Sequence, residues 1–117
     1  MREPIRDKGR LEHIIQAIDT ITESVKGVSY EDFCQNKILY GAVVYYTMII
    51  GECAYMLSLE FKQNHLDTPW TDIAGMRHHL VHGYYQVNKR DVWDVIENDL
   101  QPLRFQIGSY LKEYTEN

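Results

Sequence analysis

The sequence has little cysteine, little proline and no long apolar run. Its 117 residues include two cysteines, Cys34 and Cys53, and three prolines. Two cysteines imply no disulfide framework. The longest uncharged run, residues 38–51, is shorter than the roughly 18 residues of a membrane-spanning helix, which predicts a buried helix and no membrane. The charged N-terminal segment is followed by no apolar core of a secretory signal, so we expect a cytoplasmic protein with reduced thiols.

Positive charge is also scarce. The chain has 12 Lys and Arg against 17 Asp and Glu, a formal net charge of −5. An acidic chain repels nucleic acid, but the charge is unevenly distributed. Residues 76–90 contain Arg77, Lys89, Arg90, three of the five histidines and no acid. That segment carries +3 and the remainder −8. This basic, histidine-rich segment is the first indication of a functional site.

The hydrophobic share of 44% and its spacing predict a soluble all-helical protein. Apolar residues at steps of three and four over 11–25 predict a first helix, which Gly27 ends. Ser29 with Asp32 resembles a capping box and begins a short helix that extends to about Gln35. A long, mostly apolar helix is expected over 36–61, as the central helix or as a subunit contact.

Two further helices complete the predicted fold. Thr68 is expected to cap, and Pro69 to begin, a helix that runs to about His82. Asn88 is expected to cap a final helix over 88–114. Because Pro102 lacks an N–H group, that helix should kink or restart, with Asp99 as a candidate new cap. We therefore expect one domain, residues 1–117, formed by an up-and-down bundle of four to five helices.

The segment Arg77-His78-His79-Leu80-Val81-His82-Gly83-Tyr84 contains the candidate chemistry. His78 and His82 are four residues apart, on one side of a helix, and Arg77 precedes them. Arginine can hold a phosphate through two hydrogen bonds and stabilise developing negative charge. Histidine can take a proton from a ribose hydroxyl or donate one to a leaving oxygen. These groups suit cleavage of an RNA phosphodiester without a metal ion or other cofactor.

The spacing Arg77, four residues, His82, one residue, Tyr84 resembles the Arg-x-x-x-x-His-x-Tyr motif of HepT toxins in the HEPN superfamily. The resemblance extends over almost the whole chain. Flanking segments similar to the family's occur in the same order: Ile50-Gly51-Glu52, Pro69-Trp70, Ile73-Ala74-Gly75-Met76-Arg77, Val92-Trp93 and Asn98-Asp99-Leu100.

The resemblance implies a helical homodimer whose two motifs face each other across a composite cleft that binds RNA. In such a cleft Arg77 would bind phosphate and His82 would act as general base or acid. His78, an accepted variant at its position, would orient the pair. The resemblance also implies a type VII toxin–antitoxin pair, with an MntA-like nucleotidyltransferase as antitoxin. That partner would transfer AMP to Tyr84, and toxin and antitoxin could form a larger hetero-oligomer.

Less specific interpretations remain open for the same residues. Arg77 could form a surface salt bridge with an acid such as Asp72, and His82 could simply favour the negative end of a helix dipole. His78 and His82 could form a zinc-binding pair, although no third ligand is evident. Tyr84 could be a packing aromatic. The alternative function is a non-catalytic helical module that binds a nucleotidyltransferase or a nucleotide.

Overall fold

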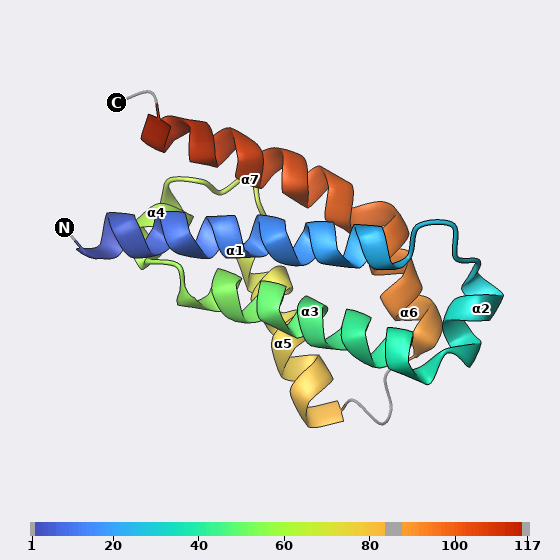
Figure 1. Cartoon of the computed structure of the whole chain (residues 1–117). Helices are drawn as coiled ribbons and strands as arrows, with labels where there is room; N and C mark the ends of the chain where they lie inside the picture. Colours follow the sequence, from blue (N-terminus) through green and yellow to red (C-terminus); the bar gives the residue numbers. More distant parts are fainter. Residues whose placement is uncertain (1, 84–87, 116–117) are drawn as a thin grey trace.

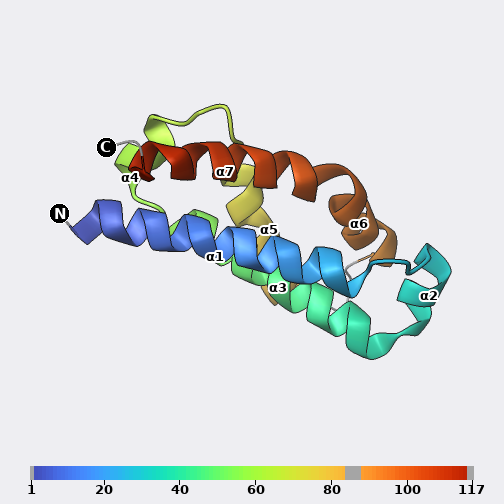
Figure 2. The ribbon, with the colours of Figure 1, turned by 45° about the horizontal axis from the view of Figure 1, so that its top comes forward.

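The protein is described by a computed structural model that places the backbone of residues 2–83 and 88–115 and the side chains of residues 6–76 and 88–114. The described segments contain helices and no strands, which confirms the all-α prediction. Three long helices, α1 (Arg2–Ser24), α3 (Lys37–Met56) and α7 (Leu100–Thr115), run up and down the molecule. Helix α1 packs against both α3 and α7, and α5 (Trp70–Gly83) crosses behind α3 (Figures 1 and 2).

Several helices begin at capping side chains, and two of these caps, Ser29 and Asn88, are the ones that the sequence predicts. The Ser29 hydroxyl accepts the N–H of Asp32 and begins α2 (Tyr30–Gln35), and the Asn36 side chain accepts the N–H of Leu39 and begins α3. Asn88 accepts the N–H of Arg90 and begins α6 (Lys89–Asp94). These contacts satisfy N–H groups that have no partner inside the helix. At the end of α1, Gly27 adopts φ 75°, which glycine tolerates best.

The single helix predicted over 36–61 is wrong, because the chain breaks at Leu57 and restarts as α4 (Leu59–Gln63). The break is fixed by Asp7, which is almost fully buried. Its carboxylate accepts the Ser58 N–H at 2.8 Å and the Ser58 hydroxyl at 2.6 Å. The Ser58 hydroxyl also accepts the N–H of Phe61 and so caps α4. The apolar pattern hides the break because Leu57 and Phe61 are both buried.

Replacing Asp7 by alanine should therefore destabilise the fold. The substitution leaves the Ser58 N–H and hydroxyl without a buried acceptor, which costs about 2 kcal/mol for hydrogen bonds to a charged group. Urea unfolding followed by circular dichroism would measure the loss. Asp67→Ala, at an exposed carboxylate, is the matched control and should stay within about 0.5 kcal/mol of wild type. Equal stability of the two variants would contradict the assigned role.

The predicted cap at Thr68 is also wrong. Helix α5 begins at Trp70, one residue later than expected. The buried Thr68 hydroxyl is used elsewhere: it donates to Gln106 Oε1 at 3.0 Å and lies 2.6 Å from the Tyr110 hydroxyl, both on α7. These tertiary contacts explain why the cap that the local sequence suggested does not form. The Trp70 indole N–H donates to the His65 carbonyl at 2.9 Å and fixes the start of α5.

The last helix is interrupted before Pro102, as predicted, but in a different form. Residues 95–99 form a π-helical turn, η2 (Val95–Asp99), in which the Leu100 N–H donates to the Val95 carbonyl. The proline cannot donate to the Asn98 carbonyl, and a wider turn accommodates that loss. Asp99 lies inside this turn and does not cap a new helix. Helices α6 and α7 consequently point in different directions (Figure 1).

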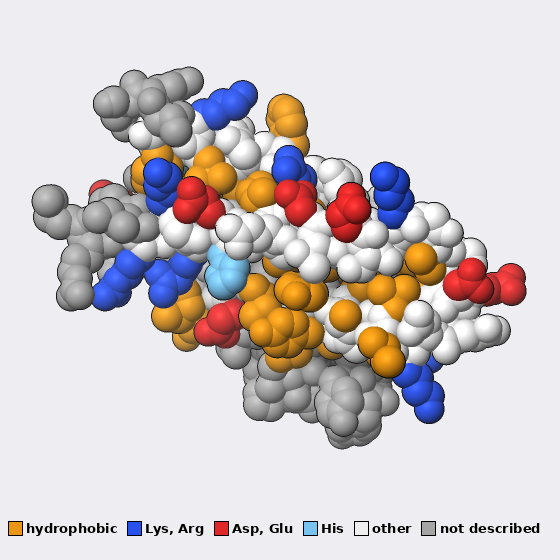
Figure 3. All heavy atoms as spheres, viewed as in Figure 1, with side chains coloured by type: hydrophobic (Ala, Val, Ile, Leu, Met, Phe, Trp, Pro, Cys, Tyr) orange, Lys and Arg blue, Asp and Glu red, His pale blue; other side chains and the backbone are white. Residues whose placement is uncertain are grey.

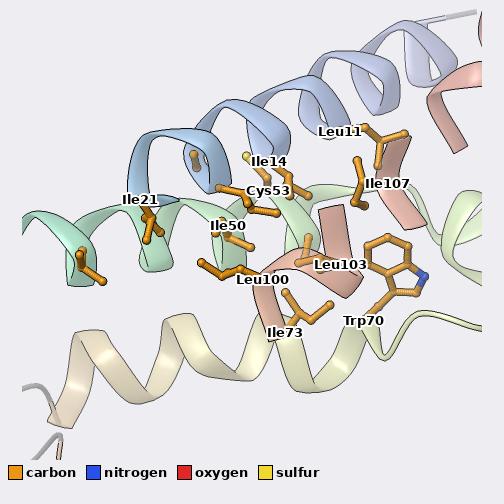
Figure 4. Close-up of a cluster of buried hydrophobic side chains, with 14 of the residues drawn as sticks. Leu11, Ile14, Ile21, Ile50, Cys53, Trp70, Ile73, Leu100, Leu103 and Ile107 are labelled. Atoms are coloured by element: carbon orange, nitrogen blue, oxygen red, sulfur yellow. The ribbon is translucent and has the colours of Figure 1, made fainter. Parts of the chain in front are cut away.

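The core lies between α1, α3, α5 and α7 (Figure 4). Its fully buried members include Leu11, Ile14, Ile50, Leu100 and Ile107. Cys53 is buried among them, as predicted, and burial raises the pKa of its thiol. Helix α3 is long and apolar enough to cross a membrane by length and composition alone, but a core helix passes the same test. One side of α3 forms the core, whereas the other remains exposed.

Candidate functional site

The candidate site is built on α5, whose two halves have different surroundings. The first half is anchored, because Trp70 and Ile73 are buried and α5 packs mainly against α3. The second half extends past α3, at the bottom of Figure 1. The motif residues Arg77, His78 and His82 belong to that second half. The fold thus places the first part of the basic segment, residues 76–83, on a helix at the edge of the molecule.

The structure brings three of the four predicted site residues onto one helix. His78 and His82 are one helical turn apart in the backbone, and Arg77 follows Ile73 by one turn. Their side chains, on which the salt-bridge, dipole and zinc alternatives depend, lie outside the described residues. Tyr84, and Tyr85 beside it, lie outside the described residues altogether. The proposed roles of Arg77, His78, His82 and Tyr84 therefore remain predictions.

A groove of about 500 Å³ adjoins this helix, between the first half of α5, the η2 turn and α7. Its walls are mostly apolar, and the side chain of Met76, the residue before Arg77, contributes to them. Asp72, Asn98 and Asp99 line it with polar groups. Two carboxylates repel a phosphate, so this groove is unsuited to the phosphodiester chemistry that the motif predicts.

The exposed side of α3, the helix against which α5 packs, is largely apolar, with Glu52 also exposed on this helix. Large apolar side chains gather below α1 in the space-filling view (Figure 3). We call this the α3 face and define it by the exposed hydrophobic residues of α3 and of the first residue of α4: Ile38, Tyr45, Tyr55, Met56 and Leu59. An exposed apolar surface of this kind marks an interaction site more often than a monomer surface. A subunit contact on this helix, as the sequence allows, would therefore use these residues.

The other two cations of the basic segment, Lys89 and Arg90, contact residues of α2. The Lys89 ammonium donates to the Cys34 carbonyl at 2.8 Å, and the Arg90 guanidinium lies 4.4 Å from the ring centroid of Tyr30. The charge pattern identified both cations, but no sequence signal paired them with residues 55 to 60 positions earlier. By contrast, Arg104 pairs with Asp19 through two bonds of 2.6 and 3.0 Å. The hydrogen bond from Arg104 lowers the pKa of Asp19.

The fold and the motif define the class of this protein: it is a small all-helical protein with a basic Arg–His motif on an outlying helix. The sequence profile of a family described as "Ribonuclease HepT-like" matches residues 14–109. The chain belongs to this HepT-like ribonuclease family, as the motif predicted.

Individual relatives agree with the family assignment. A protein of Caldanaerobacter subterraneus subsp. tengcongensis that carries an RNase name is 41% identical over 103 residues, which cover 88% of this chain and 92% of that protein. "Probable ribonuclease HepT" of Thermococcus cleftensis is 35% identical over 97 residues, 83% of this chain and 88% of that protein. No solved structure matches the chain significantly.

Proposed function

We propose that this protein is a metal-independent endoribonuclease toxin that acts as a homodimer. The observation that carries the proposal is the family match over residues 14–109, which contain Arg77 and His82 on one helix. Names of the relatives refer to ribonucleases, which supports RNA as the substrate. The acidic groove beside α5 is left out of the reaction, and the basic segment forms the cleft.

In the proposed reaction, Arg77 binds the scissile phosphate and stabilises the charge that develops on its oxygens. His82 of one protomer removes the proton from the ribose 2′-hydroxyl, and the 2′-oxygen attacks phosphorus. The bond from phosphorus to the 5′-oxygen breaks, and His82 of the second protomer donates a proton to that oxygen. The products are a 2′,3′-cyclic phosphate and a 5′-hydroxyl. His78 orients the histidine pair.

A second copy of the chain is needed to supply the second histidine, and the α3 face is where we place it. Helix α5 packs against α3, and its second half extends past α3, so two copies that meet through the α3 face would bring their α5 helices toward one cleft. Ile38, Tyr45 and Leu59 are well exposed in the single chain. Burying such side chains in a symmetric contact would remove apolar surface from water.

The proposed regulation is covalent modification of Tyr84 by an MntA-like nucleotidyltransferase, in a type VII toxin–antitoxin pair. The phenol oxygen attacks the α-phosphorus of ATP, its proton is lost to solvent, and pyrophosphate leaves. Each AMP unit adds negative charge beside the basic segment, which opposes the entry of RNA. Co-expression with such a partner should raise the intact mass by whole AMP units, and Tyr84→Phe should abolish the increment. An increment that persists in Tyr84→Phe would contradict this assignment.

The activity itself is tested on the purified protein alone. RNA incubated with it in excess EDTA should be cut into fragments that end in a 2′,3′-cyclic phosphate, because histidine and arginine supply the catalysis. Adding Mg²⁺ should leave the rate nearly unchanged. Cleavage that EDTA abolishes would contradict the mechanism.

The second candidate is a non-catalytic module that binds a nucleotidyltransferase or a nucleotide. It is favoured by the −8 charge outside residues 76–90, which leaves little cationic surface to hold a long RNA strand. This candidate predicts a stable complex with the partner and no RNA cleavage in any buffer.

A further inference from the structure

Arg90 is an exposed cation that is held in place by an aromatic ring and not by a carboxylate. Its guanidinium carbon lies 4.4 Å from the Tyr30 ring centroid. Among the described side chains it forms no ion pair, although Asp91 and Asp94 are close in sequence. A guanidinium that lies over an aromatic ring can still donate from the N–H groups at its edge.

The platform beneath Arg90 is rigid. The Tyr30 ring also contacts Trp93, with centroids 5.9 Å apart, and Trp93 is buried against Phe33. Next to it, the Lys89 ammonium donates to the Cys34 carbonyl at 2.8 Å and lies 5.5 Å from the Tyr40 ring centroid. These contacts attach α6 to α2 and α3. A cation fixed in this way loses little side-chain entropy when it binds an anion.

The position of Arg90 relates it to the motif helix. Helix α5 ends at Gly83 and Asn88 caps α6, so the five peptide steps between them span at most about 18 Å. Arg90 also closes the basic segment, residues 76–90, in which no acid occurs. The rest of the chain carries a net charge of −8, so Arg90 is a cation close in sequence to the Arg77–His82 motif that an RNA strand leaving the proposed cleft could meet.

We propose that Arg90, stacked on Tyr30, binds an RNA phosphate that neighbours the scissile one and so guides the strand through the cleft. This inference rests on the proposed ribonuclease function and adds a substrate-positioning residue to it. The planar fork of arginine fits two phosphate oxygens at once. Lysine at the same place would keep the charge but lose the stacking and the two-pronged geometry.

The test measures the affinity of a short single-stranded RNA for a cleavage-deficient His82→Ala protein at several salt concentrations. Adding Arg90→Gln should weaken binding about tenfold, as expected for one charged hydrogen-bonded contact. It should also reduce the slope of log affinity against log salt by about 0.7, the value for one phosphate contact on a single strand. Arg90→Lys should restore the slope but only part of the affinity, and Tyr30→Leu should weaken binding with the slope retained.

The matched control is Lys26→Gln, which removes one exposed charge outside the basic segment and should change neither quantity. If Lys26→Gln and Arg90→Gln weakened RNA binding equally, the loss would reflect net charge alone and the proposal would be overturned. It would also be overturned if Arg90→Gln bound RNA normally and instead weakened the complex with a nucleotidyltransferase. RNA cleavage by the Arg90→Gln protein with His82 intact separates the two proposals. If this variant cleaves RNA normally and the salt slope is unchanged, only the Arg90 contact is refuted. If the wild-type protein cleaves no RNA, the ribonuclease function is refuted.

Discussion

Alanine at Arg77 or His82 is expected to lower RNA cleavage by at least about 100-fold. Loss of a donor that stabilises transition-state charge costs about 10²–10³ in rate, and loss of a general acid or base costs about 10²–10⁴. The His82 change should be the larger, because each His82 would serve one step in a symmetric dimer. Rates from a fluorescent RNA substrate in EDTA provide the measurement, with circular dichroism to verify the helical fold.

Two neighbouring histidines provide the controls for this experiment. His79→Ala removes an imidazole from the same helix and should leave cleavage near the wild-type rate, since the motif assigns His79 no role. His78→Ala should reduce the rate by an intermediate factor, because His78 only orients the pair. Full activity of either Arg77→Ala or His82→Ala would refute the proposed mechanism.

Glutamate at Ile38 and Tyr45 together should convert the proposed homodimer to a monomer and abolish RNA cleavage with it. Ile38 is 86% exposed and Tyr45 56% exposed in the single chain, so the charges should not disturb the monomer fold. In a symmetric contact each substitution occurs twice, and four new carboxylates would be desolvated without partners. Light scattering after size exclusion measures the mass, and the same fractions are assayed for RNA cleavage.

Phe105→Glu is the matched control, because Phe105 is 80% exposed on α7, away from the α3 face. That variant should remain dimeric and active. A monomeric variant that still cleaves RNA would refute the composite cleft, and a dimeric double variant would place the subunit contact elsewhere.

Local sequence signals predicted the starts of α2 and α6 correctly. Ser29, Asn36 and Asn88 cap helices because their side chains reach N–H groups two or three residues ahead, and such contacts are visible in the sequence. The burial of Leu11, Ile14, Ile18 and Ile21 on α1 likewise follows from their spacing. Features of this kind depend on neighbours within one turn.

The errors arose where distant residues decide the structure. Helix α3 ends early because Asp7 accepts hydrogen bonds from Ser58, 51 residues away, and Thr68 is engaged by residues 38 and 42 positions later. The stacking of Arg90 on Tyr30 is equally remote in sequence. For the site, the Arg–His spacing and the charge pattern identified the helix. The exposed α3 face beside it required coordinates, because an apolar residue at helical spacing can face either the core or solvent.

Helix α5 is anchored at the end that contains Trp70 and Ile73, so a small tilt there displaces the motif residues at the other end. From Ile73 to His82 the helix rises about 14 Å, so a tilt of about 5° about Ile73 would shift the backbone at His82 by about 1 Å. A misplacement of that size can cost an enzyme about 100-fold in rate. Substitutions around the Trp70 indole, far from the proposed scissile bond, should therefore abolish RNA cleavage before they unfold the protein.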